Sequence, residues 1–296
     1  MNTENFHLSE LNDFEVSKHQ SSSETATSYY NSYLKFKEIV AELPKDELIN
    51  RGWISSKDDL ASLVPLYQSI SSNNLKTLFR KSNTSNNALC SAWLASVTTT
   101  AKLMVSIGRI NNFDGLNKNF LKEIAQLSPD VSIITKLPEI LATKGIVLVY
   151  EKALPGMKLD GVVLKLVSNN PVIGISFRYP RIDHFWFTLL HELAHICIHL
   201  DQLDTPIFDD FESEEVETNE LKANRLAKNS FVEKHAWRNC MAKYDTNPES
   251  VVEFANYIGI HPAIVAGMLQ KETNKYNRYR KLTDEVDIRK MVFGDD

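Results

Sequence analysis

The chain of 296 residues has few cysteines, no excess of positive charge and no long apolar run. Its three cysteines, Cys90, Cys197 and Cys240, lie far apart without a CxxC pair, which argues against a disulfide framework and a cysteine-rich zinc site. The net charge of −5 argues against a dedicated nucleic-acid-binding protein. No segment approaches the roughly 18 consecutive apolar residues of a membrane-spanning helix, so we expect no membrane partner.

The N-terminus also lacks the basic start and the apolar segment of a secretory signal, and we therefore expect a cytoplasmic protein. Residues 1–27 are polar and Ser-rich, and we expect them to be weakly ordered. Apolar residues at three- and four-residue spacing then predict a helical N-terminal domain over residues 28–128. The pattern changes near residue 129, where we predict a second domain, 129–296, whose C-terminal part is again helical.

Three short apolar runs mark the first part of this second domain. Residues 146–150, 161–166 and 172–176 each predict a buried strand. A long apolar helix follows them at once. We therefore predict an α+β fold that is mostly helical, with a small three-stranded sheet packed on that helix.

The predicted helix contains the motif HExxH at residues 191–195. Residues four apart lie on the same face of a helix, so the imidazoles of His191 and His195 can reach one metal ion. Glu192 stands beside them and can act as a general base on water. Because a catalytic zinc site usually takes three protein ligands, a third ligand is expected elsewhere in the chain.

Two residues were weighed as the third ligand. His199 is close in sequence, but it lies too far along a straight helix from His191, and we expect it to be a capping or surface residue. Glu220 is the better candidate, since it follows His195 by 25 residues on a second predicted helix that can fold back beside the first. Asn224, one turn after Glu220, could orient a histidine through its free ring nitrogen.

The residues so far resemble a known family. Residues 185–195, followed by Glu220-x-x-Ala223-Asn224, are similar to the ImmA/IrrE family of bacterial zinc metallopeptidases over roughly residues 130–270. The resemblance implies a zincin-like core that cleaves proteins, with Zn²⁺ held by His191, His195 and Glu220 and with Glu192 as the catalytic base.

The N-terminal half resembles one subgroup of that family. Residues 51–53, Arg-Gly-Trp, and the helices up to about residue 110 are similar to HigA-like regulators. Such regulators usually carry an N-terminal DNA-binding helix-turn-helix, and the first 50 residues here are too short and too polar for one. Residues 251–270 could also form a helix-turn-helix, but a packed helical hairpin is the commoner structure for this pattern.

Peptide hydrolysis also needs a donor for the oxyanion of the transition state. His184 and Tyr257 are candidates, and Arg178, Tyr179 and His261 are others. None of them is specified by spacing.

The leading interpretation is a zinc-dependent endopeptidase whose protein substrate is a regulator such as a repressor. One alternative is a HigA-like antitoxin or transcription regulator that binds protein or DNA and has a non-catalytic metal site. Another is a stress-response or phage-defence effector whose peptidase is switched on by a toxin or an activating partner. We expect no role for nucleic acid in the leading case.

Overall fold

The structure, a computed structural model, describes residues 30–57 except 32, 35 and 39, and residues 84–203 and 214–294. The chain divides into two compact units, Met1–Ala41 and Glu42–Asp296. The predicted polar segment 1–27 and the predicted helix at 59–70 lie outside the described residues. The predicted domain boundary near residue 129 stays a prediction. All elements below belong to the second unit.

The described part of the second unit is mostly helical and contains a three-stranded mixed sheet, which confirms the predicted fold class. The strands are β1 (Val147–Tyr150), β2 (Gly161–Lys165) and β3 (Pro171–Ile175), in the order β1-β3-β2. β1 runs parallel to β3 and β2 runs antiparallel to it. β3 is therefore the central strand, and β1 and β2 are the two edge strands.

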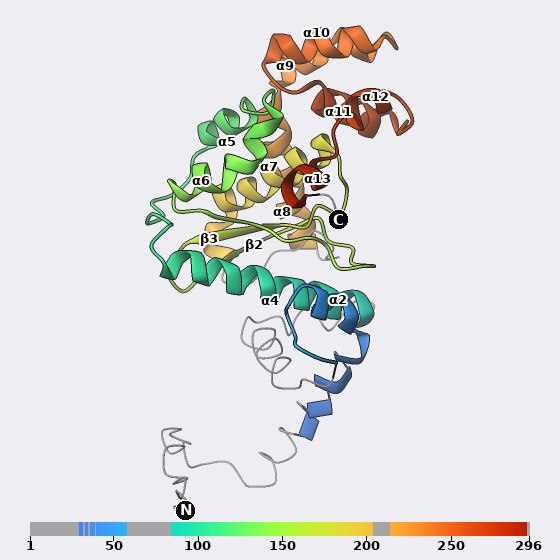
Figure 1. Cartoon of the computed structure of the whole chain (residues 1–296). Coiled ribbons are helices and arrows are strands. Elements are labelled where there is room, and N and C mark those ends of the chain that lie inside the picture. Colours follow the sequence, from blue (N-terminus) through green and yellow to red (C-terminus); the bar gives the residue numbers. More distant parts are fainter. Residues whose placement is uncertain are drawn as a thin grey trace, which may run out of the picture. The chain divides into compact units, whose positions relative to one another are not determined.

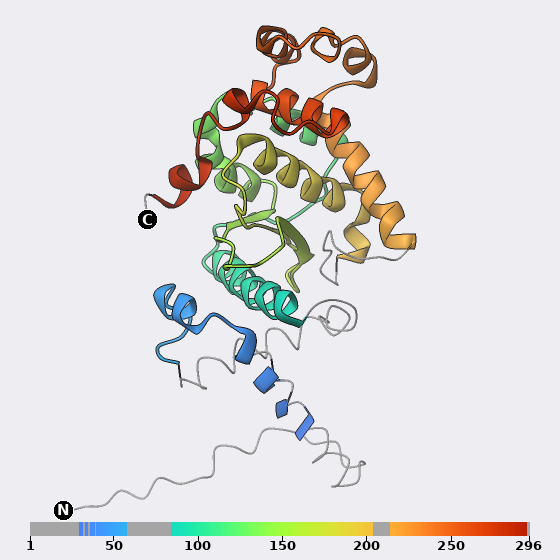
Figure 2. The same cartoon turned by 90° about the vertical axis from the view of Figure 1, so that its right-hand side faces the viewer.

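Two long helices cover the opposite faces of this sheet (Figures 1 and 2). Helix α4 (Thr84–Ser106) lies against β1 and β3, and helix α7 (Ile182–His199) lies against β2 and β3. Gly174 of β3 brings α4 close, because a Cβ there would lie 2.9 Å from the Trp93 ring. The sheet is thus buried on both sides, which explains why its strands read as continuous apolar runs.

Helix α4 is also apolar and long enough to be a candidate membrane span over Ala88–Ser106. This finding differs from the expectation of no membrane span, which rests on the absence of about 18 consecutive apolar residues. About half of the helix, 56 %, is buried inside the protein. Packing on the sheet accounts for its apolar composition. α10 (Pro248–Ile258) and α11 (Pro262–Thr273) pass the same test only as a pair bent by 117°.

Helix α8 (Glu214–Phe231) packs along α7. Ala223 and Ala227 are buried between the helices, and their small side chains allow the close approach that brings Glu220 to α7. The acidic residues among 214–217 belong to the first turn of α8. Acidic residues are favourable there because the first turn of a helix carries partial positive charge.

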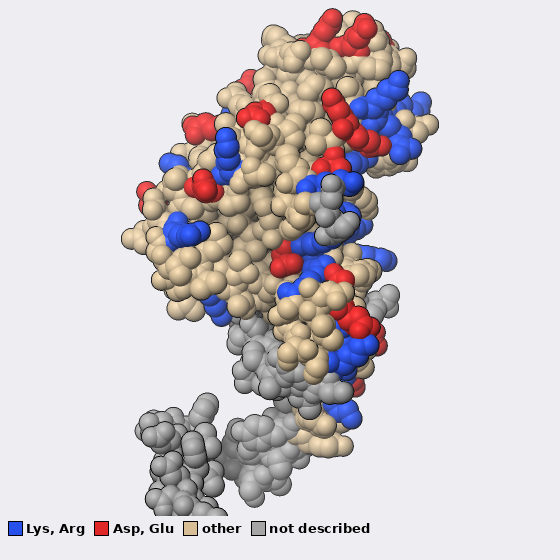
Figure 3. Space-filling view, in the orientation of Figure 1, with Lys and Arg blue, Asp and Glu red and all other residues tan. Residues whose placement is uncertain are grey.

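α10 and α11 form the predicted packed hairpin. Gly259 joins them with a φ of 74°, a left-handed conformation that glycine adopts without strain. Residues 263–270 of α11 are all buried, so this helix is not free to lie in a DNA groove. Basic side chains gather beside α11 and α12 in Figure 3, with acidic side chains among them. Basic and acidic side chains thus share this surface.

Further helices lie among the described residues. They are α2 (Lys45–Asn50), α5 (Lys118–Ala125), η2 (Val131–Lys136), α6 (Leu137–Ala142), η3 (Leu200–Gln202), α9 (Lys234–Arg238), η4 (Met241–Lys243), α12 (Arg280–Thr283) and α13 (Ile288–Phe293). Gly145 follows α6 with a φ of 76°, and its lack of a side chain leaves room for the backbone of Phe113, which a Cβ would approach to 2.5 Å.

Candidate metal centre

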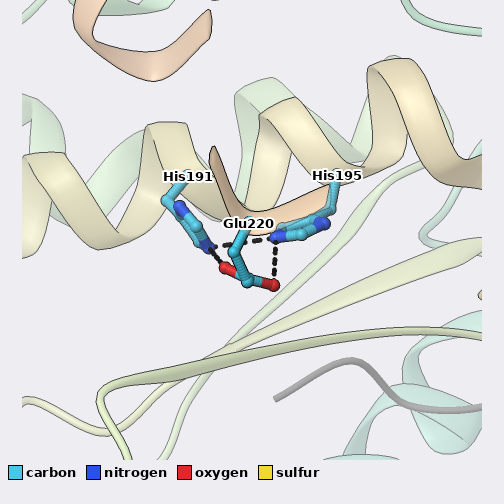
Figure 4. A group of neighbouring side chains, drawn as sticks. All are labelled: His191, His195 and Glu220. Atoms are coloured by element: carbon cyan, nitrogen blue, oxygen red, sulfur yellow. Dashed lines mark hydrogen bonds and ion pairs between the residues drawn. The ribbon is translucent and has the colours of Figure 1, made fainter. Parts of the chain in front are cut away.

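Three of the predicted site residues meet at one point between α7 and α8 (Figure 4). His191 Nε2 and His195 Nε2 lie 3.0 Å apart. The carboxylate of Glu220 closes the triangle, with Oε2 at 3.0 Å from His191 Nε2 and Oε1 at 3.2 Å from His195 Nε2. The helical spacing of the histidines and the predicted folding back of the second helix are both confirmed.

The donor atoms of this group fit a tetrahedral metal ion. Zinc bonds of about 2.0–2.1 Å would separate neighbouring donor atoms by about 3.3–3.4 Å, within a few tenths of an ångström of the distances found. Glu220 Oε1 is buried and accepts no hydrogen bond of good geometry from a described residue, although it lies close to His195. One cation at the centre of the triangle would accept a lone pair from each of the three residues.

The charges around Glu220 also favour a ligand role. Burial raises the pKa of its carboxyl, but the imidazoles of His191 and His195 outweigh that effect and lower the pKa to about 2. Glu220 is therefore ionised at neutral pH. His195 is completely buried and His191 nearly so, which shields the donor atoms from water.

Glu192 lies at the edge strand, on the side of α7 that faces the sheet. Its side chain is 2 % exposed, and a Cβ added to Gly161 of β2 would lie 2.5 Å from its Oε1. The same Cβ would lie 2.6 Å from Cγ2 of Thr188, one turn earlier on α7. A residue without a side chain at position 161 therefore makes room for the predicted base, a contact that the sequence analysis missed.

Three of the predicted oxyanion donors gather in one narrow crevice next to this contact. His184, Arg178 and Tyr179 line it together with Asp160 and Thr188. The rings of His184 and Tyr179 lie 4.4 Å apart. Burial lowers the pKa of His184, and the net effect of Asp183 and the other charged neighbours does not reverse this. The imidazole is therefore neutral at pH 7 and can donate one N–H.

The remaining candidates lie elsewhere. Tyr257 is 80 % exposed on α10, beside Phe254. His261 is buried and caps α11, where its Nδ1 accepts a hydrogen bond from the backbone N–H of Ala263. Asn224 is on the exposed side of α8. The orienting role of Asn224 and the donor role of Tyr257 stay predictions.

His199 is placed differently from the expectation of a capping or surface residue. It is 5 % exposed, and its Nδ1 lies 3.1 Å from Nδ1 of His195. Burial, together with the nearby His195 and Lys222, lowers the pKa of His199, so its ring is neutral at pH 7. The four-residue spacing of His191, His195 and His199 is the sequence signal that could have shown this contact.

The segment that contains the candidate metal site is similar to a known family. Residues 142–270 match the family model of the IrrE N-terminal-like domain. This IrrE-like domain begins in α6 and ends in α11, so it contains the sheet, α7 and α8 with all three ligand candidates.

The match and the triad together indicate a metallopeptidase. The predicted resemblance to the IrrE family is thereby confirmed for this segment. The match does not reach the N-terminal region, on which the HigA-like assignment rests. A search among curated proteins found no match to the chain.

Proposed function

We propose that the protein is a zinc-dependent endopeptidase of the cytoplasm that cleaves a specific regulatory protein, such as a repressor. The observation that carries this proposal is the convergence of His191, His195 and Glu220 within 3.0–3.2 Å, with Glu192 one residue from the first ligand. Glu192 adds a buried carboxylate next to the first ligand in the helix, the residue type that a general base on water requires. An IrrE-like domain around the group supports peptide bonds as the target.

The residues of the chain divide the work of hydrolysis. His191, His195 and Glu220 would hold the ion. When bound, zinc supplies Lewis acidity, which makes water a better nucleophile and polarises a peptide carbonyl group. Glu192 accepts a proton from the attacking water and returns it to the leaving amine nitrogen. A donor from the crevice, with His184 the best placed by its neutral ring, stabilises the oxyanion.

The test compares proteomes of cells that express the parent protein and Glu192→Gln. The amide cannot accept the proton, so we expect one or a few regulatory proteins to be cut by the parent and intact with the variant. Both purified proteins should bind one zinc ion each, measured by elemental analysis. Glu253→Gln, which changes an exposed carboxylate on α10, is the matched control and should cleave like the parent.

If Glu192→Gln cleaves the same proteins as the parent, general-base catalysis is the wrong explanation. If instead cells that express the parent show no cleavage at all, the protein acts as a HigA-like antitoxin or regulatory binding protein, and its metal is structural. Repeating the comparison under stress, with a co-expressed toxin, and during phage infection would identify the trigger.

A further inference from the structure

The C-terminal half of α7 carries a row of three imidazoles of which the metal site uses two. His199 is the third, and it lies on the far side of His195 from the ion. Nδ1 of each ring lies 3.1 Å from the other, within hydrogen-bond distance. His195 therefore has one ring nitrogen toward the metal position and one toward His199.

Metal binding by His195 allows only one arrangement of the protons in this pair of imidazoles. A neutral imidazole has one N–H, and His195 must present the lone pair of Nε2 if it is to bind a metal ion. Its proton is then on Nδ1, which makes Nδ1 of His199 the acceptor. The proton of His199 is consequently on its Nε2.

Two further residues continue this hydrogen-bond order. His199 is hydrogen-bonded to the side chain of Asn219, which precedes the ligand Glu220 on α8. The amide N–H of Asn219 donates to Oε1 of Gln202 in η3, at 3.0 Å. The carbonyl oxygen of Asn219 can then accept the N–H of His199, which gives every donor in the chain an acceptor.

The opposite order would block the metal site. If His199 donated from Nδ1, His195 would accept there and would carry its proton on Nε2, 3.0 Å from Nε2 of His191. No lone pair of His195 would then face the ion. Metal binding by His195 Nε2 selects the first order, and Asn219 can support it because its carbonyl oxygen can accept from the outer nitrogen of His199.

We propose that His199 is a positioning residue for the metal site: it accepts the Nδ1–H of His195 and, through Asn219 and Gln202, fixes the tautomer whose Nε2 faces the ion. This inference rests on the metal site of the proposed function. It also gives α8 two tasks at neighbouring residues, since Glu220 binds the ion and Asn219 closes the chain of hydrogen bonds behind His195.

The test measures zinc affinity, so it needs no substrate. Purified full-length variants are titrated with zinc in competition with a chromophoric chelator. His199→Phe keeps a ring of similar size and removes the acceptor, and we expect the affinity to fall about 10- to 100-fold. His199→Asn restores an acceptor oxygen near the position of Nδ1, and its affinity should return to within about threefold of the parent. His235→Phe, which changes an exposed histidine on α9, is the matched control and should leave the affinity unchanged.

Two results would overturn the proposal. One is parent-like affinity in His199→Phe, and the other is an equal loss in His199→Phe and His199→Asn, which would mean that ring packing matters and the acceptor does not. If His199→Phe does not fold, Asn219→Ala decides: weaker zinc binding supports the chain of hydrogen bonds, and parent-like binding refutes it. If the parent protein binds no zinc, the metal site itself is refuted. If the parent and Glu192→Gln cleave alike, general-base catalysis is refuted, but the expected zinc affinities of the His199 variants do not change.

Discussion

The two halves of helix α7 bury polar side chains for different reasons. In the first half, Asp183 is 4 % exposed and accepts two hydrogen bonds from Arg181, at 2.9 and 2.7 Å. Arg181 also donates to Gln270 of α11 at 2.7 Å, and Gly267 leaves room for the carboxylate. In the second half, the imidazoles of His191 and His195 turn their ring nitrogens toward each other and toward a carboxylate.

This difference separates a structural anchor from a ligand site. The negative charge of Asp183 is neutralised by Arg181, so this pair needs no further ligand. In the second half, the ring nitrogens and the carboxylate oxygens that face one another are also the atoms that a metal ion would bind. The first half of α7 thus anchors the helix to its neighbours, and the second half carries the candidate metal ligands.

The largest effect that would sharpen this comparison is the loss of the third ligand. Glu220→Ala should weaken zinc binding by at least about 100-fold, because a direct ligand matters more than the outer partners of a ligand. Chelator competition measures it, and Glu253→Ala, an exposed carboxylate on α10, is the control. Equal affinities of the parent and Glu220→Ala would remove Glu220 from the site.

A second change tests whether the base depends on the edge strand. Gly161→Ala should push the Glu192 carboxylate and Thr188 aside, and a misplacement of about 1 Å can lower cleavage about 100-fold. Zinc content should stay at one ion per chain. Gly174→Ala on β3 is the matched control, since it crowds Trp93 and Val97 but not the site.

The two glycine variants should therefore separate activity from stability. Gly174→Ala should lower the free energy of unfolding by about 1–3 kcal/mol through overpacking and keep the cleavage rate per folded molecule. Cleavage by Gly161→Ala at the parent rate would show that Glu192 does not need the space beside β2.

The third prediction concerns the anchored half. Asp183→Ala leaves Arg181 without its buried partner and should lower the free energy of unfolding by about 3 kcal/mol, measured by urea denaturation of the metal-free protein. Zinc affinity of the folded variant should match that of the parent. Asp201→Ala, an exposed carboxylate in η3, should change stability by less than about 0.5 kcal/mol. A loss of zinc affinity in Asp183→Ala would show that the two halves of α7 are coupled.

The smallest effect is expected at the entrance to α7. Arg289 of α13 donates to the carbonyl oxygens of Phe177 and Arg178, at 2.8 and 2.6 Å through Nη2. Removing these bonds in Arg289→Ala should lower the free energy of unfolding by about 1–2 kcal/mol. Arg280→Ala, which removes an exposed ion pair with Asp284, should change it by at most about 0.5 kcal/mol. Equal effects of the two variants would mean that α13 does not hold this loop.

The local features of the site were predictable because they depend on periodicity. The spacing of His191 and His195 requires only a helix, and apolar runs of strand length require only a sheet that is covered on both faces. Glu220 could be named from its distance along the chain, together with small residues that let two helices approach.

Contacts that depend on how the elements pack were beyond the sequence. The rotation of α8 about its own axis places Asn219 near His199 and leaves Asn224 exposed, and a shift of five positions along a helix is about 140° of rotation. The order β1-β3-β2 places Gly161 on an edge strand beside Glu192, whereas the chain order alone allows other pairings.

The sequence by itself determined which side chains could bind a metal ion, because helical geometry follows from short-range bonds of the backbone. Only the tertiary structure decided which residues contact the metal ligands and the general base, such as His199 at His195 and Gly161 at Glu192. These contacts depend on long-range packing. The rotation of one helix about its axis, or a different order of the strands, would change them while the pattern of apolar and polar residues in the sequence stays the same.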